Sequence, residues 1–164
     1  MENLRVRDLM SENLITINAD RSLADAYDLL DEFQIRHLLV IDTNLEDGGL
    51  ELIGLLTHRD LAMRALYLVE RRPYSEGQDI LRQKTVGEIM THNPETIDPD
   101  APLLEAADEM LSNKFGCLPV VEGKQLVGIL TESDFIKYVV ELITETDQAK
   151  INNEVKHSQP DQIS

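Results

Sequence analysis

Two copies of the pattern Gly-x-x-Thr-x-x-Asp stand in the sequence, at Gly54–Asp60 and at Gly128–Asp134. In each copy, which we call a corner, an apolar run ends in a threonine that can cap a helix. The free N–H groups at the start of a helix attract anions and polar ligands. A hydroxyl and a carboxylate at the same place can also hold the hydroxyls of a sugar. The two corners therefore predict a paired site for a small molecule.

The corners belong to an internal repeat. Val6–Met10 matches Val86–Met90, and Leu38–Val40 matches Leu118–Val120, with 80 positions between the copies in both cases. The corners themselves are 74 positions apart. A polar insert at 43–49 in the first copy accounts for this difference, and we expect it in a hairpin turn, where extra length is tolerated.

Each copy predicts the element order strand, helix, strand, strand, helix. A helix should begin at Ser22, because apolar residues then recur at the spacing of one buried face. Ser22 with Asp25 indicates a capping box, and Pro102 suits the first helical position of the matching helix. A further helix should start at each corner, and the last one should run over about 133–144. The first copy's strands are expected at 14–17, 37–42 and 52–56.

These elements predict an α/β (α+β) fold of two β-α-β-β-α repeats. One copy is too small to bury its sheet and helices, so the two should pack sheet to sheet about a pseudo-twofold axis. Met10 and Met90 are expected to pack between the repeats. The predicted division is a first repeat at 1–69, a linker at 70–84, a second repeat at 85–146 and a mobile polar tail at 147–164.

Composition excludes several classes of partner. The net charge of −16 argues against nucleic acid and against anionic membrane surfaces, because both require clustered cations. No apolar run approaches the roughly 20 residues of a membrane helix, and Met1–Arg5 does not begin a signal peptide. The single cysteine, Cys117, is expected as a small core residue and fits a cytoplasmic protein. No histidine, cysteine or carboxylate spacing indicates a metal site, and no catalytic motif is present.

With its doubled element order, its Val-x-x-Leu/Ile-Met openings and its two corners, the sequence resembles a tandem pair of CBS domains, named after cystathionine β-synthase. The resemblance covers about 6–144. It implies a regulatory module, not a catalyst, which binds an adenosyl compound such as AMP, ADP, ATP or S-adenosylmethionine between the repeats. It also implies a homodimer that signals to an effector protein which the sequence does not identify.

The resemblance also implies which positions contact the ligand. Asp60 and Asp134 would hold the ribose, with Thr57 and Thr131 as hydroxyl partners. The first strand of each copy would contribute Thr16, Ile17, Thr96 and Ile97. The walls around the base would be Arg36, His37, Leu38, Gly116, Cys117, Leu118 and Pro119.

The two copies differ at the corners and nearby. Leu39 stands where the second copy has Pro119. The first corner contains His58 and Arg59, which are well placed to meet a phosphate, whereas Glu132 in the second corner should repel one. We therefore expect unequal sites, with the stronger preference for anions wherever Arg59 points. Because the repeats face each other, Arg59 could contact the ligand held at either corner.

Two other functions are compatible with these residues. The corners could be helix caps alone, and the protein a ligand-free scaffold for interaction or dimerisation. An enzyme that uses paired carboxylates is a third interpretation, for which the sequence offers only abundant Asp and Glu. Stabilisation of the folded protein by an adenosyl ligand would separate the first function from the scaffold.

Overall fold

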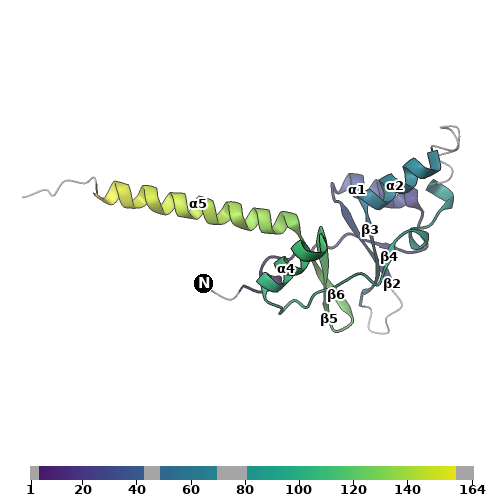
Figure 1. Ribbon diagram of the computed structural model, residues 1–164, viewed down its shortest axis with the longest axis horizontal. Coiled ribbons are helices and arrows are strands. Elements are labelled where there is room, and N and C mark those ends of the chain that lie inside the picture. The colour runs from purple at the N-terminus through teal and green to yellow at the C-terminus, as the bar shows by residue number, and fades with distance from the viewer. Residues whose placement is uncertain (1–3, 43–48, 70–80, 158–164) are drawn as a thin grey trace, which may run out of the picture.

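The protein's computed structural model describes residues 4–42, 49–69 and 81–157, and it contains one mixed sheet with helices at both ends (Figure 1). The strands follow the order β1-β2-β3-β6-β5, and β4 pairs with β3. A single pairing, Glu51 with Gln125, joins β3 to β6 and so joins the two halves. The strands are β1 (Thr16–Asn18), β2 (His37–Asp42), β3 (Glu51–Thr57), β4 (Thr91–His92), β5 (Cys117–Glu122) and β6 (Gln125–Thr131).

The helices begin close to where the sequence predicts them. Ser22 caps α1 in the predicted capping box, since the Asp25 N–H donates to Ser22 Oγ (3.1 Å) and the Ser22 N–H donates to Asp25 Oδ2 (3.2 Å). Pro102 differs from the prediction, because its extended backbone (ψ 133°) makes it the N-cap and not the first helical residue of α4. The helices are η1 (Val6–Asp8), α1 (Leu23–Glu32), α2 (His58–Val69), η2 (Val86–Glu88), α4 (Leu103–Asn113) and α5 (Glu132–His157), and residues 81–83 are also helical.

The second half lacks a counterpart to the three-residue strand β1. Ile97 makes only an isolated parallel bridge to Val120. In this bridge the Ile97 N–H donates to the Pro119 carbonyl (3.0 Å), and the Ile97 carbonyl accepts from the Val121 N–H (2.9 Å). Pro119 has no N–H to donate, so the ladder cannot extend past this point. In the first half Leu39 occupies the matching position and pairs with Thr16 in β1.

The opening of each copy packs into the opposite half. Val6 lies in the core of the second half. Two backbone hydrogen bonds hold this segment there, one from the Val6 N–H to the Ala101 carbonyl (3.0 Å) and one from the Leu103 N–H to the Leu4 carbonyl (2.8 Å). Val86 is likewise buried in the core of the first half. The start of the chain accordingly lies beside α4 (Figure 1). The predicted division at 1–69, 70–84 and 85–146 remains a prediction, and residues 70–80 lie outside the described residues.

A third apolar cluster lies between the halves and confirms their sheet-to-sheet packing about a pseudo-twofold axis. Its fully buried members are Leu39, Ile41 and Leu126, with partly buried leucine, isoleucine and valine residues around them. Met90 lies on Gly54 and Met10 lies on Gly128, so each methionine packs an opening against the opposite half's corner strand, as predicted. Residues 43–48 of the predicted turn insert lie outside the described residues.

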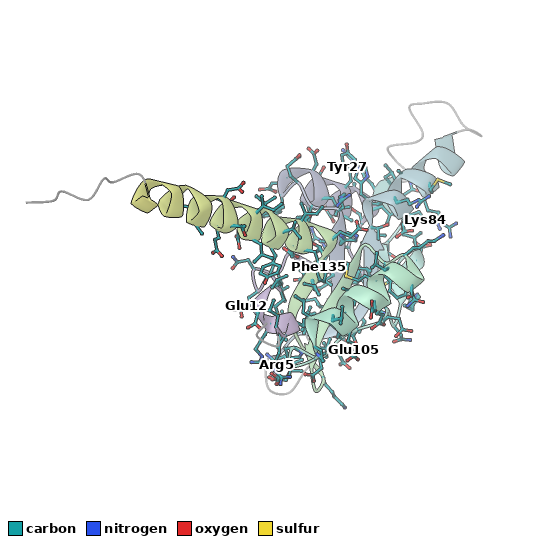
Figure 2. The ribbon with its side chains drawn as sticks, turned by 60° about the vertical axis from the view of Figure 1, so that its left-hand side comes forward. Arg5, Glu12, Tyr27, Lys84, Glu105 and Phe135 are labelled. Carbon is teal, nitrogen blue, oxygen red and sulfur yellow. The ribbon has the colours of Figure 1, made fainter. Side chains whose placement is uncertain are left out.

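Helix α5 departs most from the prediction. It continues to His157, so the expected end near Thr144 is wrong. Residues 147–157 are helical, and the mobility predicted for the tail at 147–164 remains a prediction. Phe135, where α5 leaves the body of the molecule (Figure 2), packs on the second core. The other predicted buried-face residues, Ile136, Val139, Val140 and Ile143, are between 51% and 64% exposed. None of the described helices has the length and apolar character needed to cross a membrane.

Candidate functional site

Each corner is built as a helix cap that leaves a carboxylate oxygen for other partners. In the first corner, Asp60 Oδ2 accepts from the N–H (3.0 Å) and the hydroxyl (2.7 Å) of Thr57, and the Asp60 N–H donates back to Thr57 Oγ1 (3.1 Å). These bonds fix the carboxylate at the start of α2. Within the described residues, Oδ1 of Asp60 has no side-chain or backbone donor.

The second corner repeats this geometry in a more buried place. Asp134 Oδ2 accepts from the N–H (2.8 Å) and the hydroxyl (2.7 Å) of Thr131, while Oδ1 lies 3.5 Å from Lys137 Nζ. Asp134 is 7% exposed and is the one charged side chain among the described residues that counts as buried. A buried carboxylate is costly unless it is hydrogen-bonded, and the cap supplies those bonds.

The Asp134 corner opens into a cleft of about 360 Å³, which we call the Asp134 cleft. The corner comes from the second half, whereas the opposite wall is the segment 34–37 that leads into β2. The segment that precedes β1 also lines this cleft. The residues that line this cleft include Ser11, Asn13, Ile15, Arg36, His37, Thr131, Asp134 and Lys137.

The Asp60 corner opens into a cleft of about 410 Å³, the Asp60 cleft, which is built the opposite way round. Here the corner belongs to the first half and the wall, at 114–117, to the second half. Ligand binding in either cleft would therefore bridge the two halves. The lining residues include Thr57, Asp60, Thr91, Asn93, Pro94, Glu95, Lys114, Phe115, Gly116 and Cys117.

A third cavity of about 600 Å³, the central cavity, lies between the corners. His37 lines this cavity and both clefts. Arg36 is shared with the Asp134 cleft, whereas Lys114 and Gly116 are shared with the Asp60 cleft. A Cβ on Gly116 would lie 2.9 Å from His37 Nε2, so the glycine leaves room for the imidazole. The remaining lining residues are Thr57, His58, Arg59, Ala62 and Glu132.

Burial shifts the pKa of two groups in these walls. The pKa of His37 is lowered, first by its burial and then by the nearby Arg36 charge, against smaller opposing effects of Glu132 and Asp60. The pKa of the Cys117 thiol is raised to about 12 by burial and by the charge of Glu132. Cys117 is therefore a protonated, buried thiol at neutral pH, in agreement with its predicted place in the core.

The structure brings together ten of the predicted site residues. They are Arg36, His37, Thr57, His58, Arg59, Asp60, Gly116, Cys117, Thr131 and Asp134, and each of them lines a cleft or the central cavity. The other seven predicted residues lie elsewhere. Leu38 and Leu118 point into the cores of the two halves, because side chains alternate along a strand. Ile17, Ile97 and Pro119 are also buried, Thr16 lines a separate groove along α1, and Thr96 is exposed and lines none of these cavities.

The sequence prediction missed the segments that precede the first strand of each copy. Ser11, Asn13 and Ile15 line the Asp134 cleft, and Thr91 and Asn93 line the Asp60 cleft. A signal for them was present, since Asn13 and Asn93 are 80 positions apart, the spacing of the repeat. Both segments directly follow a matched methionine.

The charges are also arranged differently from the expectation. Glu132, which was expected to repel a phosphate from the second corner, lines the central cavity instead of the Asp134 cleft. That cleft contains the cations Arg36 and Lys137. Arg59 lines the central cavity and neither cleft. Within the ranges that the structure describes, no group of three or more His, Cys, Asp or Glu side chains could hold a metal ion.

Comparisons with known proteins agree with this architecture. A family model described as CBS domain matches residues 6–67 and 86–141. A CBS domain-containing protein of Dictyostelium discoideum is 36% identical over 141 residues, which cover 84% of this chain and 92% of that protein. Several further relatives are longer, and the match spans a third of their length or less.

Two solved structures show the same fold with ligands bound. The CBS domain pair of protein MJ0100, in complex with 5′-methylthioadenosine and S-adenosyl-L-methionine, is 30% identical with a TM-score of 0.66, and the match covers 84% of this chain and 97% of that one. CBSX2 in complex with AMP is 29% identical with a TM-score of 0.66, again over 84% and 97% of the two chains.

Proposed function

The chain belongs to the CBS-domain family, and from that premise we propose that it is a non-catalytic regulatory module that binds adenosyl ligands in its two clefts. The observation that carries the proposal is the geometry of the corners. In each, a threonine holds one oxygen of an aspartate, so that the carboxylate is fixed at the edge of a cleft. The cleft volumes of about 360 and 410 Å³ lie within the usual range of small-molecule sites.

The ribose would bind at the corner in each cleft. Its hydroxyls would donate to the carboxylate of Asp60 or Asp134, a charge-assisted hydrogen bond that is stronger than one between neutral groups. The adenine would lie against the opposite wall, where Phe115 and Cys117 line the Asp60 cleft and Ile35 and Leu39 line the Asp134 cleft. AMP, ADP, ATP, S-adenosylmethionine and 5′-methylthioadenosine are the candidate ligands.

Regulation would follow from the way the clefts are assembled. Each cleft takes its corner from one half and its wall from the other, so a bound ligand contacts both halves. A ligand shifts a conformational equilibrium only by its difference in affinity for the two states. Binding would favour the arrangement of the halves in which the cleft is closed. This change in arrangement would be transmitted to an effector protein or to another copy of the chain.

We also propose a homodimer formed through the exposed helix faces. Tyr27 on α1 (Figure 2) and Ile136, Val140 and Ile143 on α5 are each more than half exposed. Exposed apolar side chains gathered on one helix are a feature of interaction surfaces. The same observation favours the alternative function, a scaffold without a ligand. Light scattering on the wild type and on Val140→Lys would test the dimer, and an unchanged monomeric mass for both would contradict it.

Thermal unfolding with a panel of ligands tests the main proposal. A ligand at 100 times its Kd should add about 2.7 kcal/mol to the free energy of unfolding. We expect at least one of the five adenosyl candidates to stabilise the wild type and to lose that effect in the double variant with Asp60→Ala and Asp134→Ala. Stabilisation by none of them would favour the scaffold.

A further inference from the structure

The two clefts are lined by opposite balances of charge. In the part of the chain that the structure describes, and apart from His37, which both clefts share, the Asp60 cleft has two carboxylates and one cation in its lining. These are Asp60, Glu95 and Lys114. The Asp134 cleft has one carboxylate and two cations, which are Asp134, Arg36 and Lys137. The Asp60 cleft is therefore net negative and the Asp134 cleft net positive, although matching segments of the repeat build both.

Substitutions at matched positions produce this difference. Glu95 and Ile15 are 80 positions apart, the spacing of the repeat, and Glu95 lines the Asp60 cleft whereas Ile15 lines the Asp134 cleft. Lys137 of α5 matches Met63 of α2 at the spacing of the corners, 74 positions. The Asp60 cleft thus has a carboxylate where the other cleft has an apolar side chain. The Asp134 cleft has a cation at a position where the first copy has a methionine.

The carboxylates of the two corners also differ in their partners. Lys137 Nζ lies 3.5 Å from Asp134 Oδ1, so a cation already faces this oxygen. Within the described ranges, neither Asp60 nor Glu95 makes a salt bridge. Opposite charges attract more strongly in a partly buried space than in open water. A cationic group is therefore favoured in the Asp60 cleft, whereas in the Asp134 cleft it would meet Lys137 and Arg36.

Resting on the proposed function, we infer that the two clefts divide adenosyl ligands by charge, and that Glu95 makes the Asp60 cleft selective for S-adenosylmethionine. This ligand carries a sulfonium and an ammonium group against a single carboxylate, so it is a net cation. AMP, ADP and ATP are anions, and the charges of the lining direct them to the Asp134 cleft. Uncharged 5′-methylthioadenosine enters both clefts. One chain therefore holds a cationic and an anionic adenosyl ligand at the same time.

Lys114 is the charge in the Asp60 cleft that opposes this preference. Its side chain is exposed, and it lines the central cavity as well as the cleft. Glu95 is also exposed, so solvent screens both charges and the selectivity is moderate. We expect S-adenosylmethionine to bind the Asp60 cleft about tenfold more tightly than the Asp134 cleft, and this ratio should fall as the salt concentration rises.

Competition between ligands tests the inference. In calorimetric titrations we expect one tight site per chain for S-adenosylmethionine, and saturation with AMP should leave the affinity of that site almost unchanged. S-adenosylhomocysteine has the same amino-acid arm but no sulfonium charge, and it should bind the same site about threefold more weakly or worse. Displacement of S-adenosylmethionine from its tight site by AMP would overturn the inference, as would equal affinities for S-adenosylmethionine and S-adenosylhomocysteine.

Charge changes at position 95 locate the preference. Glu95→Lys should lower the ratio of the S-adenosylmethionine affinity to the 5′-methylthioadenosine affinity about tenfold, and Glu95→Ile, which introduces the residue of the matched position, about threefold. Glu105→Lys is the matched control. Glu105 is an exposed glutamate on α4 (Figure 2) that lines none of these cavities, and its replacement changes the net charge of the protein equally. Equal changes of the ratio in Glu95→Lys and Glu105→Lys would refute the assignment of Glu95.

The same titrations separate this inference from the proposed function. If no adenosyl compound binds, the proposed function fails and the inference fails with it. If S-adenosylmethionine and AMP both bind but exclude each other from the same site, the proposed function stands and the division by charge is refuted. If they bind together and Glu95→Lys weakens S-adenosylmethionine selectively, both are supported.

Discussion

The contact between Gly54 and Met90 offers a direct test of whether the opening of each copy packs into the opposite half. Gly54 lies buried in β3, and a Cβ built on it would lie 2.3 Å from Met90 Sδ and 3.0 Å from Met90 Cγ. Unstrained carbon contacts lie at about 3.5–4.0 Å. In Gly54→Ala, Met90 must therefore move away from the strand. Because Met90 belongs to the opening of the second copy, the substitution disturbs the packing of one repeat's opening on the other repeat's corner strand.

The cost follows from the kind of side chain that must move. Inserting a methyl group into a packed core costs about 1–3 kcal/mol, and a flexible methionine places the change toward the lower end. For a chain of this length, each kcal/mol lowers Tm by about 2–4 °C. We therefore expect Gly54→Ala to lower Tm by a few degrees.

A double-mutant cycle measured by chemical denaturation makes the test specific. Met90→Ala alone should cost about 2–5 kcal/mol, because it leaves a cavity in the core. In the double variant the alanine methyl at 54 fills part of that cavity, so the two costs should sum to more than the measured loss. Gly128→Ala is the matched control, since Met10 covers Gly128 and its combination with Met90→Ala should be additive. Additivity of Gly54→Ala with Met90→Ala within about 0.5 kcal/mol would refute the reasoning.

Three further predictions concern the clefts. Asp134→Asn should weaken the binding of an adenosyl ligand by about 1–3 kcal/mol, the value of a hydrogen bond to a charged group. Asp25→Asn, in a similar capping box away from both clefts, should leave the affinity measured by calorimetry unchanged. Equal affinities in the two variants would contradict the role of Asp134. Because burial lowers the pKa of His37 in the folded protein, its neutral form stabilises the fold above the unfolded pKa of about 6.5. Tm should therefore fall between pH 7 and pH 5, and it should fall less steeply in His37→Gln. Parallel curves of Tm against pH for the two proteins would exclude this role for His37. Because the pKa of Cys117 is about 12, a thiol reagent at pH 8 should label the native protein slowly and the denatured protein fast, and equally fast labelling would show the thiol to be exposed.

Much of the fold could be predicted from local sequence. The strand at 37–42 is predicted and observed with the same limits, because an apolar run bounded by polar residues fits a buried strand. The capping box at Ser22 is likewise a matter of residues three positions apart. The end of α5 was missed because the sequence of its second half has no apolar periodicity, and the pattern therefore carried no sign of a helix.

The corners were determined by the sequence itself. Thr57 with Asp60, and Thr131 with Asp134, form their caps through contacts three residues apart, so local spacing was enough to find them. The tertiary structure decided what faces each corner. The exchange of the openings brings Asn13 to the Asp134 cleft and Asn93 to the Asp60 cleft, and the packing of the halves gathers Arg36, Arg59 and Lys114 around the central cavity. Those residues are distant in the chain, and only the burial of apolar surface between the two halves places them together.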